Sequence, residues 1–189
     1  MHENNEYCKQ RRQFLVLGSS LLLGTPFLFP ATPGKGQVKG DLLPDKISAE
    51  DKVKIADSTM ARDMANFFGQ GYSCAESILM VGLRYLKLPE KMVWAAGGFG
   101  GGLGQRDLCG FLTGGAMAIG LACGQLKLDR KTAKKICAKG IKSYWQWWKS
   151  EAPIHCSEIR PKKSPRGICS RLGQLSAAKV EQILVGMNG

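Results

Sequence analysis

The sequence contains no C-x-x-C pair, although it holds seven cysteines. Thioredoxin motifs, zinc ribbons and c-type haem attachment sites all need two cysteines at that spacing, so this absence excludes them. Histidine is also scarce, with two residues, and no Ser-His-Asp set, histidine-rich cluster or carboxylate pair stands out. Nothing in the chain therefore supports a hydrolase.

Acidic residues are few, because 15 Asp and Glu stand against 27 Lys and Arg, which gives a formal net charge of +12. Such an excess attracts nucleic acid, anionic lipid or an acidic protein. The chain has neither zinc-finger spacing nor an RNP-like aromatic motif, so we expect no nucleic acid partner. We expect the basic residues to form a solvated helix face and a basic loop. The charge favours an acidic protein partner.

Long hydrophobic runs are missing as well, and the most apolar segment is the moderate stretch over residues 14–29. It is shorter than the about 20 strongly apolar residues of a membrane-spanning helix. Because Arg11 and Arg12 stand just before it, residues 1–31 resemble a twin-arginine signal peptide. We therefore expect export to the periplasm or to the outer face of the cytoplasmic membrane. Cleavage near Ala31 and retention as a membrane tether both stay open, and membrane association is expected only if the signal is uncleaved.

The rest of the chain shows helical periodicity and no convincing strand. Residues 32–47 are rich in Gly, Pro and Lys, which is typical of a linker before a domain at 48–189. Capping boxes open helices at Ser48 and Ser73. The first of these helices is expected to run to Gly69.

One predicted helix, over residues 108–123, is apolar or small on every side, and Asp107 is expected to cap it. A helix of that kind is buried, so we predict an all-α fold, a compact bundle around this Gly-rich helix. Asp129 opens a long amphipathic helix that ends before Pro153. Ser176 is expected to open the last helix.

Two cysteines stand at predicted helix starts, Cys74 after the Ser73 cap and Cys109 after Asp107. The partial positive charge and free N–H groups of a helix N-terminus stabilise a thiolate over a thiol. We therefore expect both cysteines to have pKa values below the ordinary about 8.5. The alternative is that both are small buried hydrophobic residues.

Other candidates carry structural interpretations beside functional ones. Cys123 and Cys137 are expected in the core. His155 either lowers the pKa of the neighbouring Cys156, ligates a metal, or is structural. The Gly-rich loop at 97–104 has no G-x-G-x-x-G frame and follows no strand, so we expect no nucleotide. Its N–H groups are either offered to a sulfur or anion, or the loop serves tight packing.

Three segments together resemble a known family: Gly71-Tyr72-Ser73-Cys74-Ala75-Glu76-Ser77-Ile78, the loop at 97–104, and Cys109-Gly110-Phe111-Leu112-Thr113-Gly114-Gly115. They are similar to the C_GCAxxG_C_C family, described as redox-active proteins with four hallmark cysteines. The resemblance covers roughly residues 55–185 and implies that Cys156 and Cys169 are the third and fourth hallmarks. We use the name cysteine quartet for Cys74, Cys109, Cys156 and Cys169.

The resemblance implies cysteine-based redox chemistry and leaves three functions open. In the first, the quartet acts in thiol–disulfide exchange or electron transfer as catalytic residues, and the expected partner is a redox protein. In the second, the quartet binds an iron–sulfur cluster or another metal. In the third, it forms structural disulfides in a non-catalytic exported scaffold, which suits an oxidising periplasm. For the first two we expect Cys74 and Cys109 to lie close together, with Cys156 and Cys169 folding back toward them.

Overall fold

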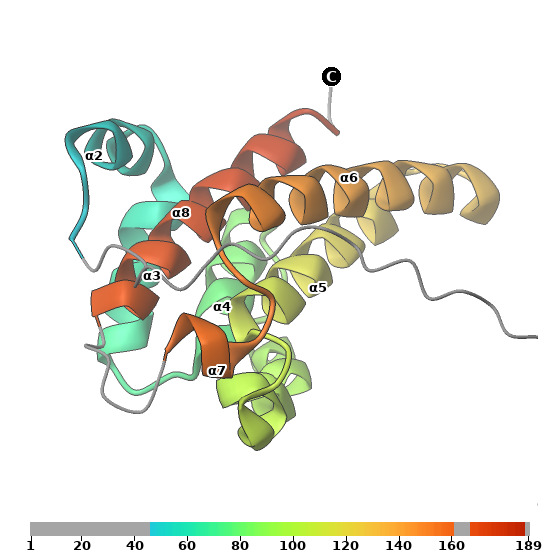
Figure 1. Ribbon diagram of the computed structural model, residues 1–189. Coiled ribbons are helices and arrows are strands. Elements are labelled where there is room, and N and C mark those ends of the chain that lie inside the picture. The colour runs from blue at the N-terminus through green and yellow to red at the C-terminus, as the bar shows by residue number, and fades with distance from the viewer. Residues whose placement is uncertain (1–45, 161–166, 188–189) are drawn as a thin grey trace, which may run out of the picture. The chain divides into compact units, whose positions relative to one another are not determined.

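The computed structural model describes residues 46–160 and 167–187 (Figure 1). The expected signal peptide at 1–31, and all but the last two residues of the expected linker at 32–47, lie outside the described residues. None of the described helices is long and apolar enough to cross a membrane.

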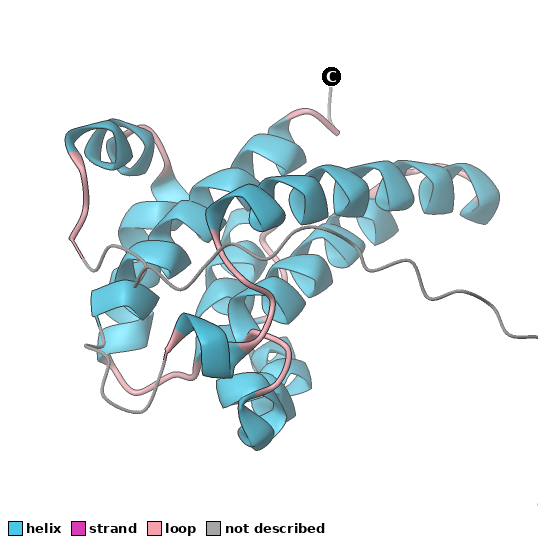
Figure 2. Cartoon of the chain, in the orientation of Figure 1, coloured by secondary structure: helices cyan, strands magenta, loops and turns pink. Residues whose placement is uncertain are grey.

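The described residues form helices joined by short connections, and Figure 2 draws no strand among them. Their bounds are α2 Ala49–Ala56, α3 Thr59–Gly69, α4 Cys74–Tyr85, η2 Glu90–Phe99, η3 Gly102–Arg106, α5 Gly110–Gln125, α6 Arg130–Glu151, α7 Cys156–Ile159 and α8 Gly167–Val185. The all-α prediction is confirmed. The extended backbone that does pair in this part of the chain is an isolated antiparallel bridge between Leu108 and His155.

The capping boxes at Ser48 and Ser73 are both present and open α2 and α4. The helix expected from Ser48 to Gly69 is broken, however, into α2 and α3. Ser58 caps α3, because its hydroxyl oxygen accepts the Ala61 N–H at 3.0 Å and its O–H donates to Glu181. Serine competes with the helical backbone for hydrogen bonds, so it favours such a break.

The last helix begins earlier than expected. It starts at Gly167, and Ser176 lies inside it, fully buried against the Tyr144 hydroxyl. The buried residues Ile168, Leu172 and Leu175 already follow helical spacing ahead of Ser176, so their packing extends the helix toward its N-terminus.

The buried Gly-rich helix is confirmed as α5, with bounds shifted by two residues at each end. It packs against α4 and, on other sides, against α6 and α8. Small residues set this closeness, because a Cβ on Gly114 would lie 2.4 Å from the Ala75 carbonyl oxygen of α4. Likewise a Cβ on Gly115 would lie 2.5 Å from the Tyr144 hydroxyl of α6.

Gly114→Ala is expected to destabilise the protein by about 1–3 kcal/mol, since the new methyl group meets rigid backbone in a packed core. Gly120→Ala in the same helix is the matched control, because nothing lies within 4 Å of its Cβ position. There the higher helix propensity of Ala should raise stability by up to about 1 kcal/mol. Urea unfolding of both variants measures the difference, and equal effects would contradict the close packing of α4 on α5.

The long amphipathic helix is α6. Tyr144 and Trp148 are buried on its inner side, where the Tyr144 hydroxyl donates to the Phe111 carbonyl and the Trp148 indole N–H to the Pro153 carbonyl. The lysines of the helix lie on its exposed side: Lys131, Lys134, Lys135, Lys139, Lys142 and Lys149. The basic excess here is a solvated helix face, as expected.

Candidate redox-cysteine site

Cys74 is the first residue of α4, directly after the Ser73 cap. Its sulfur accepts the N–H of Gly101, with 3.4 Å between nitrogen and sulfur. A Cβ on Gly110 would lie 2.3 Å from the same sulfur. The Cys74 sulfur therefore rests on the first residue of α5 and under the Gly-rich loop, which offers it an N–H group.

The Gly-rich segment at 97–104, expected to be a loop, is wound into the end of η2 and the start of η3, with non-helical backbone at Leu103 and Gly104. A Cβ on Gly100 would come within 2.5 Å of the Ser73 Cβ. The backbone stays in the left-handed region at Gly101, Gly102 and Gly104, and also at Leu103, with φ 58°, and Arg106, with φ 62°. Left-handed backbone at non-glycine residues is costly, so the surrounding packing stores strain beside the cysteine.

Cys109 departs from the sequence prediction. Helix α5 begins at Gly110, so Cys109 is its N-cap residue and does not lie within the first turn. Asp107 does not cap the helix, because its carboxylate accepts the hydrogen bond of the His155 ring at 2.6 Å.

The expected low pKa of Cys109 is wrong. Burial, with 5% of the residue exposed, and then the charge of Cys74 raise its pKa far above the ordinary value. The N–H groups of Phe111 and Leu112 donate to its sulfur and lower the pKa, but burial outweighs them. Cys109 is therefore a protonated thiol at neutral pH.

The bridge between Leu108 and His155 brings Cys156 to the same place. The Cys109 N–H donates to the Ile154 carbonyl at 2.9 Å, and the Cys156 N–H donates to the Asp107 carbonyl at 2.6 Å. Cys109 and Cys156 are diagonal neighbours across this bridge, and diagonal neighbours of paired extended segments lie about 7–8 Å apart. His155 and Asp107 pair beside the bridge, which is the structural role that was one interpretation of this histidine.

Cys74 lies close to each of the other three members of the quartet. Burial is the main cause that raises the pKa values of Cys109, Cys156 and Cys169, and the charge of Cys74 raises all three further. Since such charge effects fall off with distance, the four cysteines, carried by α4, the N-cap of α5, α7 and α8, lie in the same part of the fold. All four are free thiols.

Two arginines that the sequence analysis did not single out complete the site. The positive charges of Arg106 and Arg160 lower the pKa of Cys156, and that of Arg160 lowers the pKa of Cys169, although burial leaves both values raised. Arg106 also donates a hydrogen bond to the Arg160 carbonyl. Their spacing from the cysteines, three residues before Cys109 and four after Cys156, is the signal that a search for cations would have used.

The geometry of the quartet gives no direct sign of metal binding. Within residues 46–160 and 167–187, no three or more His, Cys, Asp and Glu side chains stand close enough together to hold a metal ion.

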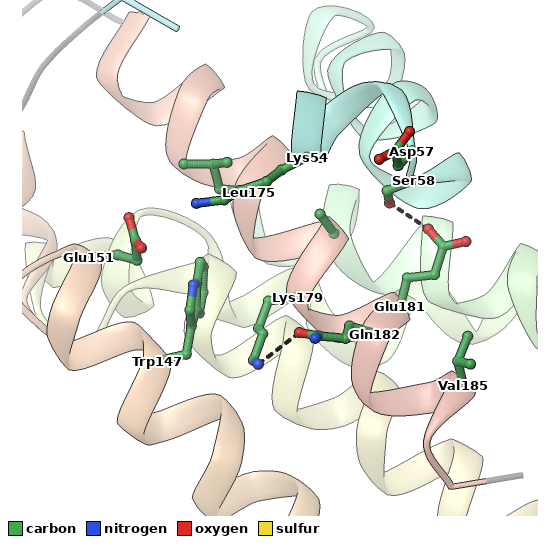
Figure 3. A pocket seen from close by; sticks show the side chains of 11 residues that line it. Lys54, Asp57, Ser58, Trp147, Glu151, Leu175, Lys179, Glu181, Gln182 and Val185 are labelled. Carbon is green, nitrogen blue, oxygen red and sulfur yellow. Dashed lines mark hydrogen bonds between the residues drawn. The ribbon is translucent and has the colours of Figure 1, made fainter. Parts of the chain in front are cut away.

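A cavity of about 530 Å³ lies elsewhere, between α2, α6 and α8, as Figure 3 shows. Trp147 forms one wall, and Lys54, Glu151 and Glu181 are among its polar lining residues. No member of the quartet lines it. The cysteine site is therefore separate from this cavity.

Comparison with known protein families gives a match. A family described as "Putative redox-active protein (C_GCAxxG_C_C)" matches residues 72–183, which include the whole quartet. No curated protein and no solved structure matches the chain.

Proposed function

This chain belongs to the C_GCAxxG_C_C family of redox-active proteins, and we propose that it is an exported thiol–disulfide or electron-transfer protein whose quartet carries the redox chemistry. The observation that carries the proposal is the position of the Cys74 sulfur, half-buried between the Gly101 N–H and the start of α5. The residue that this sulfur touches, Gly110, directly follows Cys109, and the charge of Cys74 raises the pKa values of Cys109, Cys156 and Cys169.

The proposed reaction is exchange with a partner disulfide. The Cys74 thiolate attacks one sulfur of the partner, which forms a mixed disulfide and releases the other partner sulfur as a thiolate. Cys109 then attacks the Cys74 sulfur, forms the Cys74–Cys109 disulfide and releases the second partner thiolate, which takes up the Cys109 proton. Two electrons pass from the protein to the partner, and the reverse sequence reduces the protein.

The two thiols differ in burial and in hydrogen bonding, and these differences support the two proposed roles. Cys74 is the more accessible and accepts an N–H donor, which suits the attacking group. Cys109 is buried and holds its proton, which suits a resolving thiol that reacts only after the mixed disulfide has formed beside it. Cys156 and Cys169, with Arg106 and Arg160 nearby, form a second pair to which the disulfide is passed.

Redox equilibration tests the proposal. Protein held anaerobically in buffers of reduced and oxidised dithiothreitol is quenched, alkylated and weighed. The expected result is a transition that removes two alkylatable thiols at a defined buffer ratio, because one quartet disulfide forms. A chain that keeps every thiol alkylatable at all ratios would contradict thiol–disulfide chemistry.

Export is a separate part of the proposal, supported by the sequence of residues 1–31. Changing Arg11 and Arg12 together to Lys is expected to stop export, because the paired arginines are the recognition signal of the twin-arginine route. Cell fractionation of a tagged full-length chain measures this. The matched control is Lys9→Arg, which keeps the charge and leaves the pair intact. Unchanged periplasmic or membrane signal in the double variant would rule out this route.

A further inference from the structure

A second group of sulfurs lies at the other end of α5 from the quartet. It joins Cys123, in the last turn of α5, with Cys137 of α6 and Met187, which follows α8. The Cys123 and Met187 sulfurs are 3.8 Å apart, and the Cys137 thiol lies near enough to Cys123 to raise its pKa. Because α5 has 16 residues, its ends are about 24 Å apart, so this group is distinct from the quartet.

The chain makes room for the methionine. A Cβ on Gly140, one turn after Cys137 in α6, would lie 2.3 Å from the Met187 terminal methyl carbon. The missing side chain therefore opens the place that the thioether occupies. The Met187 N–H donates to the Leu184 carbonyl at 3.2 Å, which holds the residue beyond the end of α8.

The sulfur group is closed toward the core and open toward the surface. Cys123 is 4% exposed, whereas Cys137 and Met187 are half-buried. An ion can therefore reach the group from the α6 and α8 side. Burial, followed by Cys137, raises the pKa of Cys123 to about 11, so an ion that binds must displace thiol protons.

Two thiolates and a thioether are soft ligands, and Cu(I) is the soft ion among the metals that such ligands favour. Three sulfurs around one ion, at the about 2.3 Å typical of a metal–thiolate bond, stand about 4 Å apart. The 3.8 Å between Cys123 and Met187 fits that triangle. We propose that Cys123, Cys137 and Met187 form a three-coordinate Cu(I) site.

Binding involves no redox step. One Cu(I) ion replaces two thiol protons, and the product carries one negative charge in all. Because protons are released, affinity for Cu(I) should rise with pH over the neutral and mildly alkaline range.

The test is an anaerobic titration of the reduced full-length chain with Cu(I) held by a coloured chelator. The quartet is unchanged in every protein compared, so its own Cu(I) binding cancels. Cys137→Ser is expected to bind one Cu(I) fewer than the wild type. Met187→Leu is expected to weaken that one ion by at least about tenfold, the least that disturbing a metal's surroundings usually costs. Met117→Leu is the matched control, a half-buried methionine of α5 that lies outside the group.

Circular dichroism identifies any variant that fails to fold. If Cys137→Ser fails to fold, Met187→Leu tests the site instead, because it keeps the size and apolarity of the side chain. Equal Cu(I) stoichiometry and affinity in the wild type, Cys137→Ser and Met187→Leu would overturn the site. Loss of the ion in Cys137→Ser together with full affinity in Met187→Leu would overturn the three-sulfur assignment. Neither result bears on redox exchange at the quartet.

Discussion

A Cys74→Ser variant is expected to lose the fast reaction with an aromatic disulfide by at least about a hundredfold, as removal of a reacting nucleophile does. The reason is that Cys74 combines access to solvent with an N–H donor at its sulfur, and the buried Cys109 holds its proton. In stopped-flow mixing of prereduced protein with 5,5′-dithiobis(2-nitrobenzoate), the wild type should release two equivalents of coloured thiolate in its fast phase. The first comes from attack by Cys74 and the second from resolution by Cys109.

The second cysteine gives this experiment its internal check. Cys109→Ser should release one equivalent in the fast phase and retain the mixed disulfide on Cys74, because the resolving thiol is gone. Cys137→Ser, a cysteine of α6 outside the quartet, should behave as the wild type. A fast phase that survives in Cys74→Ser would show that another sulfur is the attacking group.

Stability at alkaline pH should report the burial of Cys109. Its pKa is raised in the folded protein, mainly by burial, so above the ordinary about 8.5 the unfolded chain loses a proton that the folded chain keeps. The stabilisation is present below that pH and is lost as pH rises. Each such thiol lowers the free energy of unfolding by up to about 1.4 kcal/mol per pH unit.

Urea unfolding of the wild type and Cys109→Ala between pH 7 and pH 9.5 measures that slope. The variant is expected to be less stable at pH 7, because it loses packing, and to have a shallower decline above pH 8.5. Leu112→Ala is the control, since it removes an equally buried side chain of α5 without a titrating group. Parallel declines in the wild type and Cys109→Ala would show that this thiol titrates as freely in the folded protein as in the unfolded one.

Much of the helical architecture could be predicted because its signals are local. The capping boxes at Ser48 and Ser73 and the unbroken run of small and apolar residues in α5 needed no tertiary information. The break at Ser58 and the early start of α8 were missed. Both depend on partners far along the chain, since Ser58 bonds Glu181, and Ser176 is buried against Tyr144.

The position of Cys74 could be predicted from the sequence, whereas the electrostatics of Cys109 could not. Cys74 has the helix-start position that the sequence indicated. Cys109 is the N-cap of α5 and not a residue of its first turn, because Asp107 pairs with His155 across a bridge that no local pattern predicts, and burial then dominates the pKa of Cys109. Arg106 and Arg160 could not be predicted for the same reason. Arg160 reaches the site only when α7 folds back onto the start of α5.

The central claim is that Cys74 and Cys109 are the reacting pair of a redox site. Disulfide mapping of the folded protein tests it most directly: the reduced chain is oxidised with one equivalent of oxidised dithiothreitol, alkylated, digested and analysed by mass spectrometry. The account predicts that the first disulfide to appear joins Cys74 to Cys109, with Cys156 and Cys169 still alkylated. A first disulfide between Cys156 and Cys169, with Cys74 and Cys109 remaining as free thiols, would contradict it and would make the quartet a structural staple of the C-terminal segment.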